Sequence, residues 1–144
     1  MKYRLAQLAD VPSLCHLESL QPRAAQWDEA GWQTELAERS AYILCAQDKA
    51  ETVGFVALRL AAGICEILNV AVAPSHARQG IGESLLRQAV DWVISQRGEQ
   101  ITLEVGATNR PAIGLYQKVG FKQVGMRKNF YNGNEDALIL ALQL

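Results

Sequence analysis

The hydrophobic and polar positions change their period along the chain and divide it into strand-like and helix-like segments. Short runs rich in β-branched and apolar residues predict strands, whereas apolar residues spaced three and four apart predict one face of a helix. Strands are predicted at Tyr3–Gln7, Ala41–Ala46, Thr52–Leu60, Gly63–Val72, Ile101–Val105, Lys122–Lys128 and Asp136–Leu142. Helices are predicted after Asp10, from Asp28 to about Arg39, from Gly80 to Gly98, and from Asn109 to Val119. The pattern therefore predicts a mixed α/β sheet of about seven strands with four helices.

Local signals mark several boundaries of these elements. Asp10 and Asn109 are residue types that cap helix amino termini, and Gly120 suits the end of the last helix. Asn132-Gly133-Asn134 is a strong hairpin-turn sequence between the last two strands. The strand–helix–strand unit from Gly63 to Val105 predicts a right-handed crossover between parallel strands, while the strands before it are expected to be antiparallel.

Composition places the chain among ordinary globular proteins. Of its 144 residues 49% are hydrophobic and 20% are charged, and no repeat or linker divides them, so we expect one domain over residues 1–144. A net charge of −1 gives no overall field to attract nucleic acid or an anionic membrane. The sequence has no apolar run long enough for a membrane span and no signal-type block at its start, so we expect a cytoplasmic protein. Its oligomeric state is not indicated.

The cysteines and histidines favour neither a disulfide nor a metal scaffold. Cys15, Cys45 and Cys65 are odd in number, lie in apolar stretches and form no Cys-x-x-Cys pair, which is typical of reduced thiols in a core. His16 and His76 have no second ligand at a metal-motif spacing, so no metal site is expected. Cys65 has no histidine at an informative position, so we expect it in the core and not as a nucleophile.

The most informative segment lies where a predicted strand ends and the longest predicted helix begins. It reads Asn69-Val70-Ala71-Val72-Ala73-Pro74-Ser75-His76-Ala77-Arg78-Gln79-Gly80-Ile81-Gly82. Glycines at 80 and 82 leave room for a phosphate beside backbone N–H groups, and the dipole of the following helix favours negative charge there. A pyrophosphate would fit, although a glycine-rich helix start without a ligand is the alternative. A Walker loop is excluded because no Gly-Lys-Ser/Thr follows, and the dinucleotide fingerprint because its third glycine is lacking.

Two groups of residues resemble the GNAT family of N-acetyltransferases. The segment from Ala77 to Gly82 resembles the motif Gln/Arg-x-x-Gly-x-Gly/Ala, which grips the pyrophosphate of coenzyme A, with Ala77 in place of Gln or Arg. The second group consists of Leu103-Glu104-Val105, Asn109, Ala112-Ile113-Gly114-Leu115-Tyr116 and Val119-Gly120-Phe121. The resemblance extends from Tyr3 to Leu142. It implies a mostly antiparallel sheet that is splayed between its fourth and fifth strands to admit the pantetheine arm.

The resemblance also implies a role for individual residues. The cofactor-binding residues would be Val70, Ala71 and Val72 for the pantetheine and acetyl group, Arg78, Gln79, Gly80, Ile81, Gly82 and Glu83 for the pyrophosphate, and Asn109 for a further contact. Glu104 would be the general base and Tyr116 the general acid toward the leaving sulfur. We expect Glu83 to face solvent, because an inward carboxylate would repel phosphate.

Each of these residues also has a simpler interpretation. Glu104 could be a strand carboxylate facing water, Tyr116 an aromatic packed on Phe121, and Asn109 only a helix cap. The joint spacing beside a phosphate-type loop favours the functional interpretation.

The likeness is strongest to family members that acetylate the amino terminus of a ribosomal protein. It rests on Trp27-Asp28-Glu29, Arg127-Lys128-Asn129-Phe130-Tyr131 and Glu135-Asp136-Ala137. It implies acetyl-CoA as cosubstrate, a ribosomal-protein amino-terminal alanine as acceptor, and Trp27 and Tyr131 as substrate-binding aromatics. An α-amine, with a reference pKa of about 7.7 to 8.0, also loses its proton more easily than lysine at about 10.4. The alternatives are acetylation of lysine, a polyamine or another small amine, and a coenzyme A-binding module without turnover.

Overall fold

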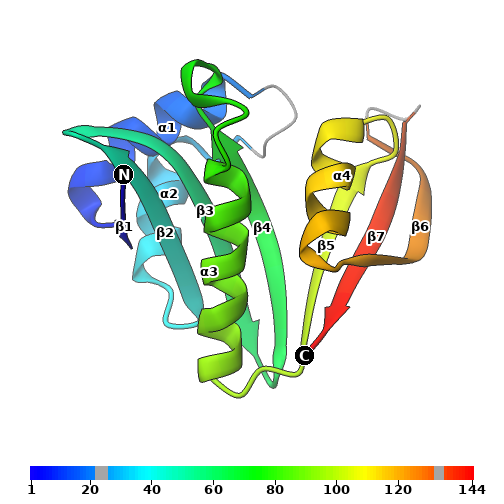
Figure 1. Ribbon diagram of the computed structural model, residues 1–144. Helices are drawn as coiled ribbons and strands as arrows, with labels where there is room; N and C mark the ends of the chain where they lie inside the picture. Colours follow the sequence, from blue (N-terminus) through cyan, green and yellow to red (C-terminus); the bar gives the residue numbers. More distant parts are fainter. Residues whose placement is uncertain (22–25, 132–134) are drawn as a thin grey trace.

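The strands form one twisted sheet in the part of the chain that the structure, a computed structural model, describes: residues 1–21, 26–131 and 135–144. The seven strands lie in the order β1-β2-β3-β4-β5-β7-β6 (Figure 1). Their bounds are β1 Lys2–Leu5, β2 Ala41–Asp48, β3 Glu51–Ala61, β4 Ile64–Val72, β5 Gln100–Gly106, β6 Lys122–Tyr131 and β7 Glu135–Gln143. The β4–β5 pair is parallel and the other pairs are antiparallel. The predicted mixed sheet with its parallel crossover strands is therefore confirmed.

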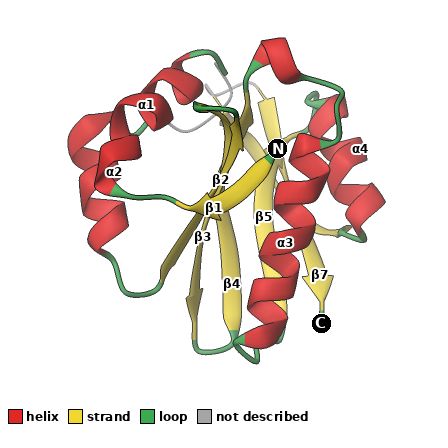
Figure 2. Ribbon diagram, turned by 60° about the vertical axis from the view of Figure 1, so that its left-hand side comes forward, coloured by secondary structure: helices red, strands yellow, loops and turns green. Residues whose placement is uncertain are grey.

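Helices cover both faces of this sheet. They are α1 Val11–Ser19, α2 Asp28–Ala37, α3 Ile81–Ser95 and α4 Arg110–Val119, with 3-10 turns at Leu8–Asp10 and Pro74–His76. Figure 2 shows α1 and α2 on one face and α3 and α4 on the other. The apolar stripe of α3 is buried because its residues recur every three to four positions; they are Ile81, Leu85, Leu86, Ala89 and Val93.

The sheet splits between β4 and β5. These strands pair only at Ile64↔Gln100, Cys65↔Ile101 and Glu66↔Thr102. Beyond these pairs the strands separate, and Figure 1 shows them opening like a V, with α3 beside β4 and α4 beside β5. The splay between the fourth and fifth strands that the family resemblance implied is thereby confirmed.

A bulge in β4 lies just beyond the last β4–β5 pair. The register of β4 against β3 jumps from Leu58↔Ile67 to Ala57↔Asn69, which leaves Leu68 as an extra residue. A bulge bends its strand and increases the local twist. Its place at the opening indicates that it helps to turn β4 away from β5.

Two predicted helix caps differ from the structure. Asp10 precedes α1, but a 3-10 turn comes first, and its carboxylate accepts hydrogen bonds from Gln7 N at 2.7 Å and from both terminal nitrogens of Arg4 at 2.7 and 2.8 Å. The hydrogen bonds from Arg4 lower the pKa of Asp10. Asn109 does precede α4, yet its side chain makes no capping hydrogen bond. The predicted turn at 132–134 lies outside the described residues.

The cysteines are free thiols, as predicted. Cys45 and Cys65 are fully buried and Cys15 is partly buried. Burial raises the pKa of the Cys45 and Cys65 thiols to about 12. The thiolate is the nucleophilic form, so Cys65 is unsuited to attack despite its place in β4.

Candidate active site

The turn between β4 and α3 has the backbone of an anion site. Arg78 and Gly80 have positive φ angles of 62° and 80°, and the first hydrogen bond of the helix start runs from Ser84 N to Gly80 O at 3.0 Å. The N–H groups of the first helical turn therefore have no intrahelical acceptor. A Cβ at residue 80 would meet no atom within 4 Å, so the space above this backbone is open. Open donors at a helix amino terminus favour a phosphate group.

The turn is fixed on both sides of its exposed part. Before it, Ala73 N donates to Val53 O at 2.8 Å, and His76 Nε2 lies 2.9 Å from Asp48 Oδ2. After it, Ile81 is buried in the core. Residues 77–80 are exposed between these points, so the predicted phosphate loop is a short exposed span on a fixed scaffold.

Gly82 serves helix packing in this structure. A Cβ at this position would lie 3.1 Å from Leu115 Cδ2 of α4 and 3.8 Å from Val72 Cγ2 of β4. The missing side chain therefore lets α4 approach the first turn of α3 and the end of β4. The sequence predicted only the approach of a phosphate here.

The β4 side of the opening is formed by Val70, Ala71 and Val72. They pair with Val56, Phe55 and Gly54 of β3 and have no β5 partner. In an antiparallel strand alternate residues direct their N–H and C=O groups to opposite sides, so part of this backbone faces the opening. The carbonyl of Val72 already accepts a hydrogen bond from Gln21 Nε2 at 2.8 Å, which the sequence did not reveal.

Glu104 lies on β5, on the other side of the opening. Its neighbours Leu103 and Val105 are buried, whereas the Glu104 side chain is 25% exposed. Its Oε1 lies 3.1 Å from Nε of Arg127 on β6. Both side chains line a recess of about 290 Å³ with Glu66, Ile67 and Leu68. Glu104 is thus an ion-paired carboxylate in a recess and not one simply facing water.

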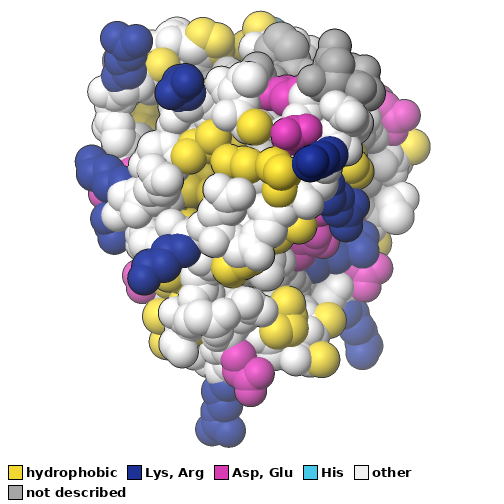
Figure 3. All heavy atoms as spheres, turned by 90° about the vertical axis from the view of Figure 1, so that its right-hand side faces the viewer, with side chains coloured by type: hydrophobic (Ala, Val, Ile, Leu, Met, Phe, Trp, Pro, Cys, Tyr) yellow, Lys and Arg dark blue, Asp and Glu magenta, His cyan; other side chains and the backbone are white. Residues whose placement is uncertain are grey.

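Arg127 connects this recess to the outer edge of the sheet. Its side chain is 56% exposed, and its guanidinium lies 5.2 Å from the centre of the Phe130 ring. On the edge strand β6, Val124, Met126 and Phe130 are exposed hydrophobic residues. Figure 3, which views this side of the molecule, shows hydrophobic side chains gathered between Lys and Arg side chains. In the sequence, Arg127 was noted only as part of the family resemblance, and its contact with Glu104 was not predicted.

Tyr116 lies in the last part of α4, and Asn109 directly precedes that helix. The Tyr116 ring packs on Phe121 with centroids 5.8 Å apart and planes at 63°, so the simpler interpretation describes a real contact. That contact helps to fix the orientation of the ring. Asn109 stands directly before the helix, and its carbonyl accepts from Ile113 N at 3.0 Å.

Glu83, which was predicted to face solvent, is partly exposed and forms two ion pairs. Its side chain is 25% exposed and lies between two cations: Oε1 is 2.9 Å from Lys118 Nζ, and Oε2 is 2.9 Å from Arg87 Nε. The hydrogen bonds from Lys118 and Arg87 lower the pKa of Glu83. The opposing charges allow a carboxylate to stay in the first turn beside the loop.

Of the two predicted substrate-binding aromatics, the structure describes the side chain of Trp27 but only the backbone of Tyr131. Trp27 is half-buried, and its ring lies 4.7 Å from that of the fully buried Trp32. The backbone N–H of Trp27 donates to both Glu18 carboxylate oxygens at 3.1 Å. Tyr131 is placed only by its backbone, which pairs with Glu135 at the end of β6, and its side chain lies outside the described residues.

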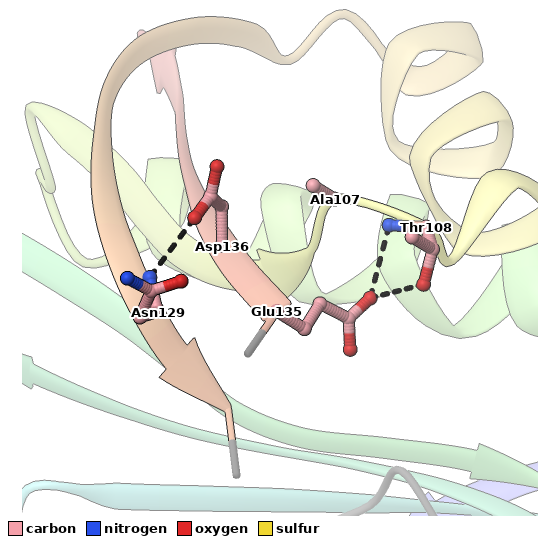
Figure 4. A pocket seen from close by; sticks show the side chains of 5 residues that line it. All are labelled: Ala107, Thr108, Asn129, Glu135 and Asp136. Atoms are coloured by element: carbon pink, nitrogen blue, oxygen red, sulfur yellow. Dashed lines mark hydrogen bonds between the residues drawn. The ribbon is translucent and has the colours of Figure 1, made fainter. Parts of the chain in front are cut away.

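A second recess, of about 620 Å³, lies between the β5–α4 loop and the β6–β7 pair. Figure 4 shows Glu135 reaching toward Thr108 and Asp136 toward Asn129. Glu135 Oε2 accepts from Thr108 N at 3.0 Å and from the Thr108 hydroxyl, and Asp136 Oδ1 accepts from Asn129 N at 2.9 Å. The Glu135 carboxylate thus connects β7 to the loop before α4, and the Asp136 carboxylate connects β7 to β6.

Among the residues that the structure describes, no group of three or more His, Cys, Asp or Glu side chains could hold a metal ion. Within the same ranges, every helix is too short or too polar to cross a membrane.

Comparisons with known proteins agree with this geometry. The profile of the acetyltransferase (GNAT) family matches residues 5–121. The [ribosomal protein bS18]-alanine N-acetyltransferase of Escherichia coli K12 is 30% identical and covers 96% of this chain and 94% of its own. The N-alpha-acetyltransferase RimI of Mycobacterium tuberculosis is 32% identical over 73% of this chain and 67% of its own. The crystal structure of the ribosomal-protein-S18-alanine N-acetyltransferase from Escherichia coli has a TM-score of 0.89 and 28% identity, and covers 99% of this chain and 92% of that chain.

Two glycines with open space around them should respond oppositely to alanine. Gly80→Ala should lower the free energy of unfolding by about 1 to 2 kcal/mol, because its φ of 80° is unfavourable for a Cβ. Gly114→Ala, inside α4 with no atom within 4 Å of the new Cβ, should raise it by about 0.5 to 1 kcal/mol. Urea unfolding followed by circular dichroism measures both, and destabilisation of similar size in both variants would contradict the loop geometry.

Proposed function

The chain belongs to the GNAT family of acetyltransferases, and we propose that it transfers the acetyl group of acetyl-CoA to the α-amine at the amino terminus of a protein. The observation that carries this proposal is the opening of the sheet. Beyond Glu66 and Thr102, β4 and β5 separate, with an anion-type loop after β4 and Glu104 on β5. A donor with a diphosphate and an acceptor amine can meet at such an opening from different sides.

The residues present suit acetyl-CoA. The backbone donors from Arg78 to Glu83 would hold the pyrophosphate, and the space above Gly80 admits it. The β4 backbone at Val70–Val72 would bond to the amides of the pantetheine arm, and Asn109 would contact the cofactor from the start of α4. Acetyl-CoA supplies a thioester whose carbonyl carbon accepts a nucleophile.

The protein's own groups would handle the protons. Glu104 would accept the proton that the amine loses as its nitrogen bonds to the acetyl carbon, directly or through one water. A backbone N–H near Val70 would stabilise the oxyanion, and Tyr116 would protonate the thiolate as the carbon–sulfur bond breaks. The burial and raised thiol pKa of Cys65 favour this direct transfer over an enzyme-bound acetyl group.

The acceptor side favours a cation. Glu66 and Glu104 contribute two carboxylates to the recess against the one guanidinium of Arg127, so its formal charge is negative. An α-ammonium would be drawn to it and could then lose its proton, since its reference pKa of about 7.7 to 8.0 is close to neutral. By similarity to the bS18-alanine N-acetyltransferase, we propose a ribosomal-protein amino-terminal alanine as acceptor, with Trp27 and Tyr131 as its aromatic contacts.

The proposed acceptor also suggests where the protein acts. Ribosomal proteins are made in the cytoplasm, so we propose that residues 1–144 act there as one N-acetyltransferase domain. Acetyl-CoA and a protein amino terminus are the partners that this chemistry uses.

The assigned acid and base can be tested separately from folding. Glu104→Gln and Tyr116→Phe should each lower kcat by about a hundredfold or more, because each removes one proton transfer. Acetyl transfer to an amino-terminal alanine peptide is measured at saturating acetyl-CoA. Glu99→Gln and Tyr3→Phe are the matched controls and should keep wild-type kcat. Unchanged turnover in both site variants would remove the assigned roles.

The choice of acceptor can be tested with a peptide panel. A peptide with a free amino-terminal alanine should be acetylated at least about a hundredfold more efficiently, by kcat/KM, than the same sequence with a blocked terminus and an internal lysine. Mass spectrometry identifies the acetylated atom. Transfer mainly to the lysine of the blocked peptide, or to a polyamine, would favour the alternative acceptors. Binding of acetyl-CoA with no transfer to any member would favour a module without turnover.

A further inference from the structure

The phosphate loop has an unusual distribution of charge. Ala77 stands where the family motif has Gln or Arg, so one polar contact to the pyrophosphate is lost. Glu83, in the first turn of α3, adds a carboxylate at the place where a diphosphate would bind. Such a carboxylate suits the helix dipole but repels phosphate. A cation close to Glu83 would offset this repulsion.

A lysine from another helix pairs with the Glu83 carboxylate. Lys118 Nζ is 2.9 Å from Glu83 Oε1, and the Lys118 side chain is 67% exposed. Lys118 follows Leu115 by three residues, so both project from the same face of α4. Leu115 contacts the first turn of α3 because Gly82 has no side chain. The packing of the two helices thus brings this ammonium group to the first turn of α3.

Arg87 is differently placed. Its Nε lies 2.9 Å from Glu83 Oε2, but it is four residues farther along the same helix. Four residues correspond to a rise of about 6 Å away from the helix amino terminus. Lys118 reaches Glu83 from α4 instead, on a flexible stem whose ammonium has three donors.

From this arrangement we propose that Lys118 is a phosphate-binding residue of the acetyl-CoA site, held beside the loop by Glu83 when the site is free. The ammonium binds a phosphate oxygen while staying close to Glu83, and so supplies the side-chain contact that Ala77 lacks. This inference rests on the proposed assignment of residues 78–83 to the pyrophosphate.

A double-mutant cycle separates binding of phosphate from neutralisation of Glu83. If Lys118 only neutralises Glu83, Lys118→Gln weakens binding in the wild type but has no effect once Glu83→Gln has removed the carboxylate. If Lys118 contacts phosphate, Lys118→Gln weakens binding in both backgrounds. Glu83→Gln keeps the backbone N–H of residue 83 and removes the carboxylate, so its own Kd is the reference for the double variant.

The measurement is the Kd for coenzyme A by isothermal titration calorimetry. Lys118→Gln should raise the Kd about tenfold in the wild type and at least about threefold in the Glu83→Gln background, and it should reduce the dependence of log Kd on log salt. Lys122→Gln, an exposed lysine on β6, is the matched control and should leave the Kd unchanged. Saturating acetyl-CoA should restore the wild-type kcat of Lys118→Gln.

Two outcomes overturn this inference for different reasons. Equal Kd values for Glu83→Gln and the double variant, with tight binding by the wild type, would reject the role of Lys118 and leave the proposed function intact. Failure of the folded wild type to bind coenzyme A would reject the proposed function and this inference together.

Discussion

Hydrogen bonding between β4 and β5 ends after Glu66 and Thr102, and the candidate site lies where it would have continued. Backbone groups that face such an opening need a partner, because an unpaired buried N–H or C=O group is costly. A pantetheine arm carries amides that can form hydrogen bonds with these backbone groups. The bulge at Leu68 turns β4 outward, while α3 and α4 cover the two separated parts of the sheet. Contact between α3 and α4 at Gly82 then holds the loop beside the opening.

Charge is divided across this opening in a way that the net charge of −1 conceals. On the loop side, Lys118 and Arg87 outweigh the carboxylate of Glu83. On the acceptor side, the carboxylates of Glu66 and Glu104 outweigh Arg127. An anionic donor and a cationic acceptor are therefore each met by opposite charge. Local pairs can do this without a large overall field because their interactions act over a few ångströms, within a Debye length of about 8 Å at physiological salt.

The sequence predicted what local periodicity determines. The apolar stripe of α3 and the β-rich runs placed the helices and strands correctly along the chain. It could not predict contacts between distant residues. The ion pair of Glu83 with Lys118 was missed because Lys118 lies on another helix and is distant from Glu83 in the sequence. The Arg127 contact with Glu104 and the Leu68 bulge were missed for the same reason, since both depend on how strands meet in the sheet.

Amide hydrogen exchange with and without coenzyme A tests directly whether the opening is the binding site. Binding there should slow exchange in two separate segments, the β4 backbone at Val70–Val72 and the helix start at Gly80–Glu83. These are the donors that the ligand would cover. The far end of β5 at Gln100–Thr102, which already pairs with β4, should exchange equally in both samples. Unchanged exchange in both binding segments, at a coenzyme A concentration that saturates the protein by calorimetry, would contradict the account.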